Sequence, residues 1–136
     1  MSELKVRALT EKLSEVLVFI DGMLEENDCP VKTQFQIDVA VEEIFVNIAN
    51  YAYNEEGGDA EIEASVSGDP KVIKITFKDS GMPYDPLKKE DPDVTLGIED
   101  RQIGGLGIFM VKKSMDNVEY EHKDGKNILT IYKTLI

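Results

Sequence analysis

Apolar residues recur at helical spacing in the first part of the chain. A first helix is predicted from Thr10, as its N-cap, to about Glu26, because the apolar positions between them mostly follow at intervals of three or four residues. Cys29 and Pro30 interrupt this pattern, and a second helix is predicted from about Thr33 to Tyr53. Its apolar positions share one arc of roughly 80° on the helical wheel, which predicts a stripe facing the core. The stripe consists of Ile37, Val41, Ile44, Ile48 and Ala52.

Apolar and polar residues alternate in four later segments, and this period predicts strands. Two strands are expected over 61–66 and 73–78, with 67–70 as the loop between them. Two more are expected over 118–123 and 128–132, joined by a turn at Asp124-Gly125. Both pairs are therefore predicted to be antiparallel hairpins.

The segment between the two hairpins lacks a regular period. Residues 79–103 contain three prolines and mixed charges, which favours a functional lid at about 84–103, with plain disorder as the alternative. Gly104-Gly105-Leu106-Gly107 then opens a third helix, which ends at Asp116-Asn117. Its apolar positions are Phe109, Met110, Val111 and Met115.

The predicted order of elements is helix, helix, strand, strand, lid, helix, strand, strand. Because hairpins rather than crossovers join most strands, this order predicts an α+β fold. We expect a two-layer α/β sandwich, in which a mostly antiparallel mixed sheet carries the helices on one face. A single domain over residues 1–136 is expected, since this length is typical of one domain and short for two.

Charge and composition narrow the classes of function. The chain has 27 acidic and 15 basic residues, a net charge of −12, which argues against direct binding of nucleic acids or anionic membranes. One cysteine, Cys29, excludes an internal disulfide and suits a reducing compartment. No apolar run approaches the ~20 residues of a membrane span, and the first residues do not resemble a secretory signal. A cytoplasmic protein is expected.

Glu43 and Asn47 form the first polar cluster. They are four positions apart on the second predicted helix and so adjacent on one of its faces, and Asn50 shares that side. A carboxylate and an amide at this spacing can polarise a hydroxyl and hold a hydrated magnesium ion. The alternative is a solvated polar flank of the helix.

The second cluster, Asp79-Ser80-Gly81, follows a strand directly. An aspartate at a strand end can accept a hydrogen bond from the exocyclic amine of adenine, whereas guanine presents a carbonyl there. Gly81 would let a flat base approach the backbone closely. An ordinary turn is the alternative, because Asp and Gly are turn residues.

The third cluster is the glycine-rich segment 104–107, which enters a helix. Its backbone N–H groups can converge on phosphate, and the helix N-terminus adds positive potential. No Gly-Lys-Ser/Thr follows, so the segment is not a Walker loop, and no strand precedes it as in a Rossmann fingerprint. A packing or hinge role is the alternative.

In this order the three clusters resemble the nucleotide-binding boxes of GHKL-type ATPases, which share the Bergerat-type fold with an ATP lid. Within that superfamily the chain is similar to the small stand-alone serine-protein kinases of bacterial signalling that are also anti-sigma factors. Three stretches carry the resemblance, Val41–Tyr53, Asp79–Pro86 and Gly104–Asp116, and the order of elements matches over nearly the whole chain.

The resemblance implies a role for each matched residue. Glu43 matches the general base that takes the proton of an attacking serine hydroxyl, and Asn47 matches the Mg²⁺ ligand. Asp79 matches the carboxylate that reads adenine, and Gly81 the glycine beside the base. The other nucleotide-binding positions are Asn50, Gly104, Gly105, Leu106 and Gly107. ATP and Mg²⁺ are thus the implied substrate and cofactor.

One departure concerns the adenine pocket. Relatives often carry Gly-Thr after the last hairpin turn, with the hydroxyl near the adenine-reading aspartate, but here Lys126 and Asn127 follow Gly125. Asn127 and Thr130 are the two candidates that could replace that hydroxyl. Arg101, Lys88 and Lys89 of the lid are either phosphate contacts or solvated charges.

The function implied is an ATP-dependent serine-protein kinase that phosphorylates a STAS-type antagonist protein and regulates transcription as an anti-sigma factor. The alternative is an ATP-binding regulatory switch that binds partners without significant phosphoryl transfer. Glu43 favours the kinase, because a switch needs no general base. A sigma factor and a PP2C-type phosphatase of the same pathway are further implied partners, and related kinases often form homodimers.

Overall fold

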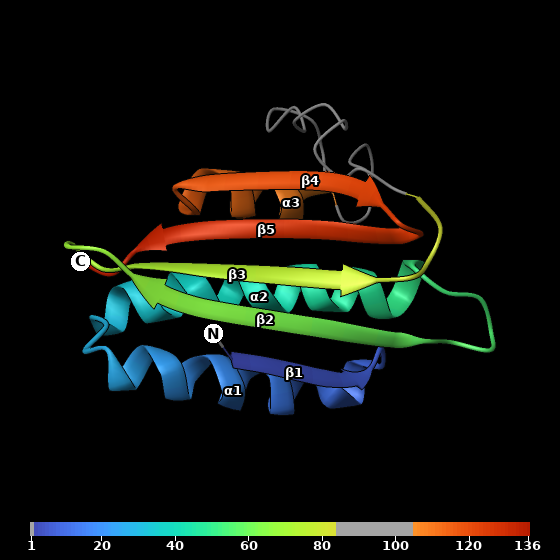
Figure 1. Cartoon of the computed structure of the whole chain (residues 1–136), viewed down its shortest axis with the longest axis horizontal. Helices are drawn as coiled ribbons and strands as arrows, with labels where there is room; N and C mark the ends of the chain where they lie inside the picture. Colours follow the sequence, from blue (N-terminus) through green and yellow to red (C-terminus); the bar gives the residue numbers. More distant parts are fainter. Residues whose placement is uncertain (1, 84–104) are drawn as a thin grey trace.

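A five-stranded antiparallel sheet forms one layer of the molecule (Figure 1). The computed structural model describes residues 2–83 and 105–136. Within these ranges the strands are β1 (Ser2–Arg7), β2 (Asp59–Ser67), β3 (Val72–Asp79), β4 (Asn117–Lys123) and β5 (Lys126–Thr134), in the order β1-β2-β3-β5-β4. The predicted α+β sandwich is confirmed, and every strand pair in the described ranges is antiparallel rather than mixed.

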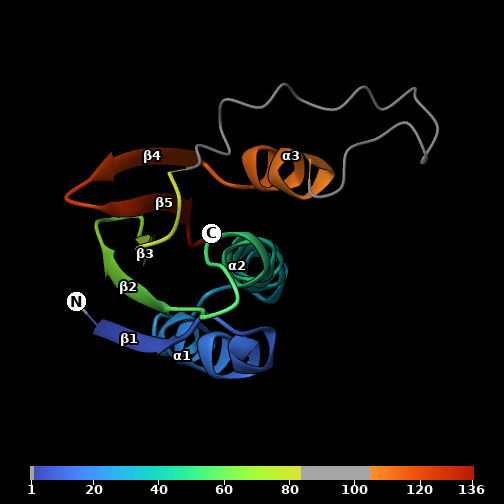
Figure 2. The ribbon, with the colours of Figure 1, turned by 90° about the vertical axis from the view of Figure 1, so that its right-hand side faces the viewer.

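The helices form the second layer. They are α1 (Leu13–Glu26), α2 (Val31–Tyr51) and α3 (Gly105–Ser114), and a short 3₁₀ turn, η1 (Thr10–Lys12), precedes α1. Figure 2 shows all three on one side of the sheet, with α2 between α1 and α3. No helix among the described residues combines the length and the hydropathy needed to cross a membrane.

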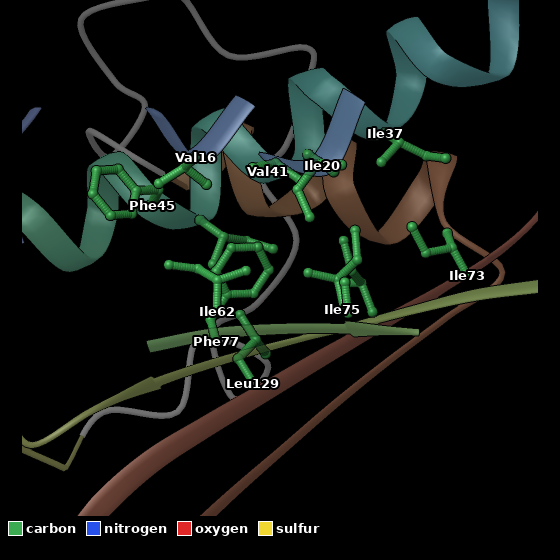
Figure 3. Close-up of a cluster of buried hydrophobic side chains, with 14 of the residues drawn as sticks. Val16, Ile20, Ile37, Val41, Phe45, Ile62, Ile73, Ile75, Phe77 and Leu129 are labelled. Carbon is green, nitrogen blue, oxygen red and sulfur yellow. The ribbon is translucent and has the colours of Figure 1, made fainter. Parts of the chain in front are cut away.

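The core lies between the two layers (Figure 3). Alternate residues of each central strand point toward the helices, as the period of two requires. Each large side chain buried in this way stabilises the fold by roughly 1.5–3 kcal/mol. The largest fully buried side chains include Ile62, Ile75 and Phe77 from the sheet and Val16, Ile20, Ile37, Val41 and Phe45 from the helices.

The beginning of the chain departs from the prediction. β1 was not expected, although Leu4 and Val6 alternate with charged residues, and it pairs with β2 at the sheet edge. Thr10 as the N-cap of the first helix is wrong. Leu9 has the extended backbone that precedes the first turn, and neither η1 nor α1 has a side-chain cap.

The second and third helices match their predictions with small corrections. α2 starts at Val31, directly after Pro30, and four of the five stripe residues are buried. Ala52 follows the helix as its C-cap and is half-buried. In α3, Met110 is 50% exposed, so it is not a core position, and Ile108 is buried instead.

The end of β3, the end of α2 and the start of α3 lie at the same end of the sheet (Figure 1). β4 runs in the direction of β3, because each is antiparallel to β5. α3 finishes beside the start of β4 and therefore begins at the end where β3 finishes. α2 finishes there too, since the amide of Met82, just after β3, donates to the carbonyl of Ala52, just after α2 (3.1 Å).

Candidate functional site

Asp79 is the most buried acidic residue at this end of the sheet. It is the last residue of β3, faces the helical layer like Phe77 two positions earlier, and is 6% exposed. Its carboxylate Oδ1 accepts hydrogen bonds from the Gly81 amide (2.9 Å) and from Asn127 Nδ2 (2.9 Å). Because both described donors end on Oδ1, Oδ2 is the oxygen left for a ligand.

Asn127 lies directly opposite Asp79 in the register of β3 and β5. Its Nδ2 also donates to the carbonyl of Met82 (2.8 Å), and its Oδ1 accepts from the hydroxyl of Tyr120. A carboxylate and a backbone carbonyl can only accept, so the orientation of the amide follows from its neighbours. Of the two candidates left open by the sequence, Asn127 is the one that contacts Asp79.

Thr130 serves a different purpose. It lies on the opposite face of β5, where its hydroxyl bonds to that of Thr76 on β3 (3.3 Å). Both hydroxyls are buried, and their pairing satisfies them away from the helical layer. Thr130 therefore does not form the floor of the pocket at Asp79.

Gly81 is required by the backbone of α2. A Cβ at this position would lie 2.0 Å from the carbonyl oxygen of Ala52, far inside any real contact. The glycine thus lets the chain after β3 run against the end of α2, where the Met82 amide is bound. Its predicted contact with a base stays a prediction.

Tyr53 is a residue at this corner that the sequence did not single out. Its hydroxyl accepts from the Ser80 amide (2.7 Å) and donates to the carbonyl of Asp59 (2.6 Å), so it joins the end of β3 to the start of β2. Burial raises the pKa of this phenol, and the charges of Asp79 and Asp59 raise it further. Gly58 leaves room for the ring, since a Cβ there would lie 2.3 Å from it.

The first polar cluster lies on α2, upstream of this corner. Glu43 and Asn47 are half-buried and Asn50 is exposed. Glu43 precedes Ala52 by nine positions, which at the helical rise places it about 13 Å from the Asp79–Gly81 corner along the helix axis. α2 therefore connects the two clusters as a rigid spacer.

The third cluster lies at the start of α3. Gly105, Leu106 and Gly107 form the first turn of α3, which packs on α2, whereas Gly104 and the lid residues 84–103 lie outside the described residues. The first amides of a helix have no intrahelical partner and attract anions. The structure thus places this turn at the end of the molecule that holds Asp79.

A hollow of about 320 Å³ also borders Tyr53 and Asp79. Its lysines come from the sheet face that points away from the helices, and each pairs with a carboxylate there. The pairs are Lys5 with Asp59 (3.7 Å), Lys78 with Glu63 (3.0 Å) and Lys126 with Glu61 (3.2 Å). Since these charges are already neutralised, we assign this hollow no ligand.

A protein-family model described as the histidine kinase-like ATPase domain matches residues 6–133. The chain therefore belongs to the histidine kinase-like ATPase family, and the resemblance to GHKL-type ATPases is confirmed. Domains of this family use ATP.

Two relatives of the chain are protein kinases by name. The chain is 25% identical over 129 residues to the serine/threonine-protein kinase BtrW of Bordetella bronchiseptica, covering 95% of this chain and 89% of that one. It is 27% identical over 137 residues to the serine-protein kinase RsbW of Oceanobacillus iheyensis, covering 93% and 82% respectively.

Solved structures share the fold. The RsbU and RsbW domains of a Mycobacterium tuberculosis protein align with 99% of this chain at a TM-score of 0.66 and 16% identity. The histidine kinase domain of a blue-light-activated kinase from Erythrobacter litoralis aligns with 96% at a TM-score of 0.54 and 14% identity. The chain spans about a third of the first of these proteins (33%) and 62% of the second.

Proposed function

We propose that this chain is a Mg²⁺-dependent serine-protein kinase that uses ATP. One observation carries the proposal. A buried acceptor, Asp79, lies at the end of α2, and a carboxylate–amide pair lies upstream on that helix, Asn47 about 7.5 Å and Glu43 about 13 Å from this corner along the axis. The start of α3 lies at the same end as Asp79. This spacing suits a nucleoside triphosphate that extends along the helix.

The residues near Asp79 fit an adenine base. Oδ2 can accept a hydrogen bond from the exocyclic amine, and its burial makes a wrong partner costly. Guanine would place a carbonyl oxygen against this acceptor. Adenine is therefore the purine that the described donors and acceptors favour.

The residues on α2 fit the reacting end of the nucleotide. We assign Glu43 as the general base, within reach of a serine hydroxyl that docks beside α2, and Asn47 as a ligand of Mg²⁺. When bound, Mg²⁺ neutralises the charge that develops on the transferred phosphoryl group. Among the described residues no three His, Cys, Asp or Glu side chains cluster to bind a metal, so the ion would depend on Asn47, phosphate oxygens and water.

The remaining contacts are assigned by the same proposal. Asn50, Gly81 and the segment 104–107 (Gly104, Gly105, Leu106 and Gly107) would contact the nucleotide, the last through backbone amides at the start of α3. Net charge −12 makes these local N–H groups the main source of positive potential for phosphate in the described part of the site.

The protein substrate that we propose is a STAS-type antagonist, and the chain would act in the cytoplasm as an anti-sigma factor. The names of the BtrW and RsbW relatives support the kinase class. A sigma factor and a PP2C-type phosphatase are proposed as further partners, and a homodimer as the assembled state.

Glu43→Gln tests this function. We expect phosphoryl transfer to fall at least 100-fold, because a positioned base contributes about 10²–10⁴-fold, while ATP affinity stays within about threefold of the wild type. The assay combines Mg²⁺, labelled ATP and a STAS-domain protein as the candidate substrate, followed by phosphoserine mapping.

Glu42→Gln is the matched control, because Glu42 is the exposed neighbour on the same helix. This variant should transfer phosphate at the wild-type rate. Transfer that survives in Glu43→Gln contradicts the assigned base. ATP binding without any transfer by the wild type supports the regulatory switch instead.

A further inference from the structure

Asn127 uses every polar atom of its side chain. The residue is 7% exposed, and its Nδ2 donates to both Asp79 Oδ1 and the Met82 carbonyl. Its Oδ1 accepts from the Tyr120 hydroxyl. A buried side chain with three fixed partners has one orientation, so it can impose that orientation on its neighbours.

We propose that Asn127 is the positioning residue that sets the purine specificity of this site, by holding the Asp79 carboxylate in place as an acceptor for adenine. The inference rests on the proposed function, because it assumes that a purine nucleotide binds at Asp79.

The two donors on Oδ1 explain how specificity arises. A carboxyl group held by Asn127 Nδ2 and the Gly81 amide must present an acceptor to both, which excludes a proton on Oδ1 and fixes the plane of the carboxylate. Oδ2 then meets the base with a defined direction. Without Asn127 the carboxylate retains one donor and can rotate.

Asn127 also holds the chain that follows β3. Its second bond, to the Met82 carbonyl, fastens that turn to β5, while the Met82 amide fastens it to α2. A threonine hydroxyl at this position has one hydrogen to donate, whereas the amide group has two. The asparagine thus positions both the carboxylate and the backbone beside it.

Asn127→Asp is the first test, because it keeps the shape of the side chain and replaces the donor by an acceptor. At pH 8 two carboxylates would face each other, and we expect ATP affinity to fall at least 10-fold. At pH 5 a proton shared between them restores a donor, so part of the affinity should return. Calorimetric titrations at both pH values measure this change.

Other titratable groups near Asp79 are present in both the wild type and Asn127→Asp. Their contribution to the pH dependence is therefore contained in the wild-type profile. They are the hydroxyls of Tyr53 and Tyr120, the exposed His122 opposite Asn127 on β4, and Lys78 and Lys126 on the other face of the sheet. The quantity compared is the difference between variant and wild type.

Asn127→Ala is the second test, and it concerns base selection. We expect the ratio of ATP to GTP affinity to fall at least fivefold. Thr130→Val is the matched control, since it removes a buried hydroxyl from the opposite face of the same strand and should leave the ratio unchanged. A wild-type pH profile in Asn127→Asp, or an unchanged ratio in Asn127→Ala, overturns the inference. A wild type that binds no ATP overturns the proposed function, and the inference with it.

Discussion

The direction of each hydrogen bond at Asp79 determines what a bound base meets there. In Asp79→Asn, the two N–H donors that now hold Oδ1 would select the amide oxygen for that place and leave the NH₂ group toward the ligand. We expect ATP affinity to fall at least 10-fold, about 1.4 kcal/mol, and GTP affinity to fall less or to rise, because NH₂ can donate to the carbonyl of guanine. Titration with both nucleotides measures the change.

Asp124→Asn provides the comparison for this substitution. Asp124 has a positive φ of 54° in the β4–β5 turn, a conformation that asparagine tolerates well. The Asp124→Asn variant makes the same chemical change at an exposed position of the turn and should leave both affinities unaltered. An equal loss of ATP and GTP affinity in Asp79→Asn contradicts its role in reading the base.

The residues at the site were predictable to different degrees. Asp79 and Glu43 stand out because each has a recognisable place at the end of a strand or on a helix face. Asn127 could have been chosen over Thr130 from alternation alone, since it shares the parity of Leu129 and Ile131, which are buried toward the helices. Tyr53 gave no such signal, because its two partners depend on where β2 and β3 lie relative to α2.

At the scale of elements, the contact between α1 and α2 contains a pair of acidic side chains. Asp21 on α1 and Asp38 on α2 each have a buried Oδ1 without a hydrogen-bond partner among the described residues. Burial first, and then the neighbouring carboxyl group of Asp21 and the charge of Glu25, raise the pKa of Asp38 from 3.8 to about 8. The folded chain thus retains a proton here that the unfolded chain releases.

This pair should weaken the fold as pH rises. The folded state binds the extra proton between pH 4 and pH 8, so its free energy of unfolding falls across that window and levels off above it. Asp38→Asn mimics the protonated form, and we expect it to be about 1 kcal/mol more stable than the wild type at pH 8 and similar to it at pH 4. This figure is small because Asp38 is only half-buried and water screens the pair.

Urea unfolding at pH 4, 6 and 8 measures this difference. Glu42→Gln on the same helix, whose carboxyl is exposed, should follow the wild type at each pH. A difference between Asp38→Asn and the wild type that is constant with pH would show that no proton is retained at this contact.

Local sequence patterns predict α2 and the β2–β3 hairpin better than they predict β1. α2 is long and strongly periodic, and the hairpin β2–β3 has clear alternation and a turn, so each is stabilised by residues near in sequence. β1 has only a short alternation, and its partner β2 lies some fifty residues later. Its strand conformation comes from that distant pairing, which a local period does not reveal.

At the scale of the whole molecule, the candidate site depends on the order of strands in the sheet. β3 pairs with β5 and not with β4, and this places Asp79 opposite Asn127 although 48 positions separate them. Local periodicity does not determine that neighbour relation. The family resemblance predicts that the clusters converge, whereas the register identifies Asn127 as the residue that meets Asp79.

Amide hydrogen exchange tests whether these separated segments form one site. If ATP binds at the end of the molecule where β3 finishes and α3 begins, it should slow exchange at Gly81, at Met82 and in the first turn of α3 together. ATP at 100 times its dissociation constant adds about 2.7 kcal/mol to the folded state, which corresponds to roughly 100-fold slower exchange for amides that open with the site. Amides of β1, at the far edge of the sheet, should change little. Protection at only one of the two segments would mean that they do not share a ligand.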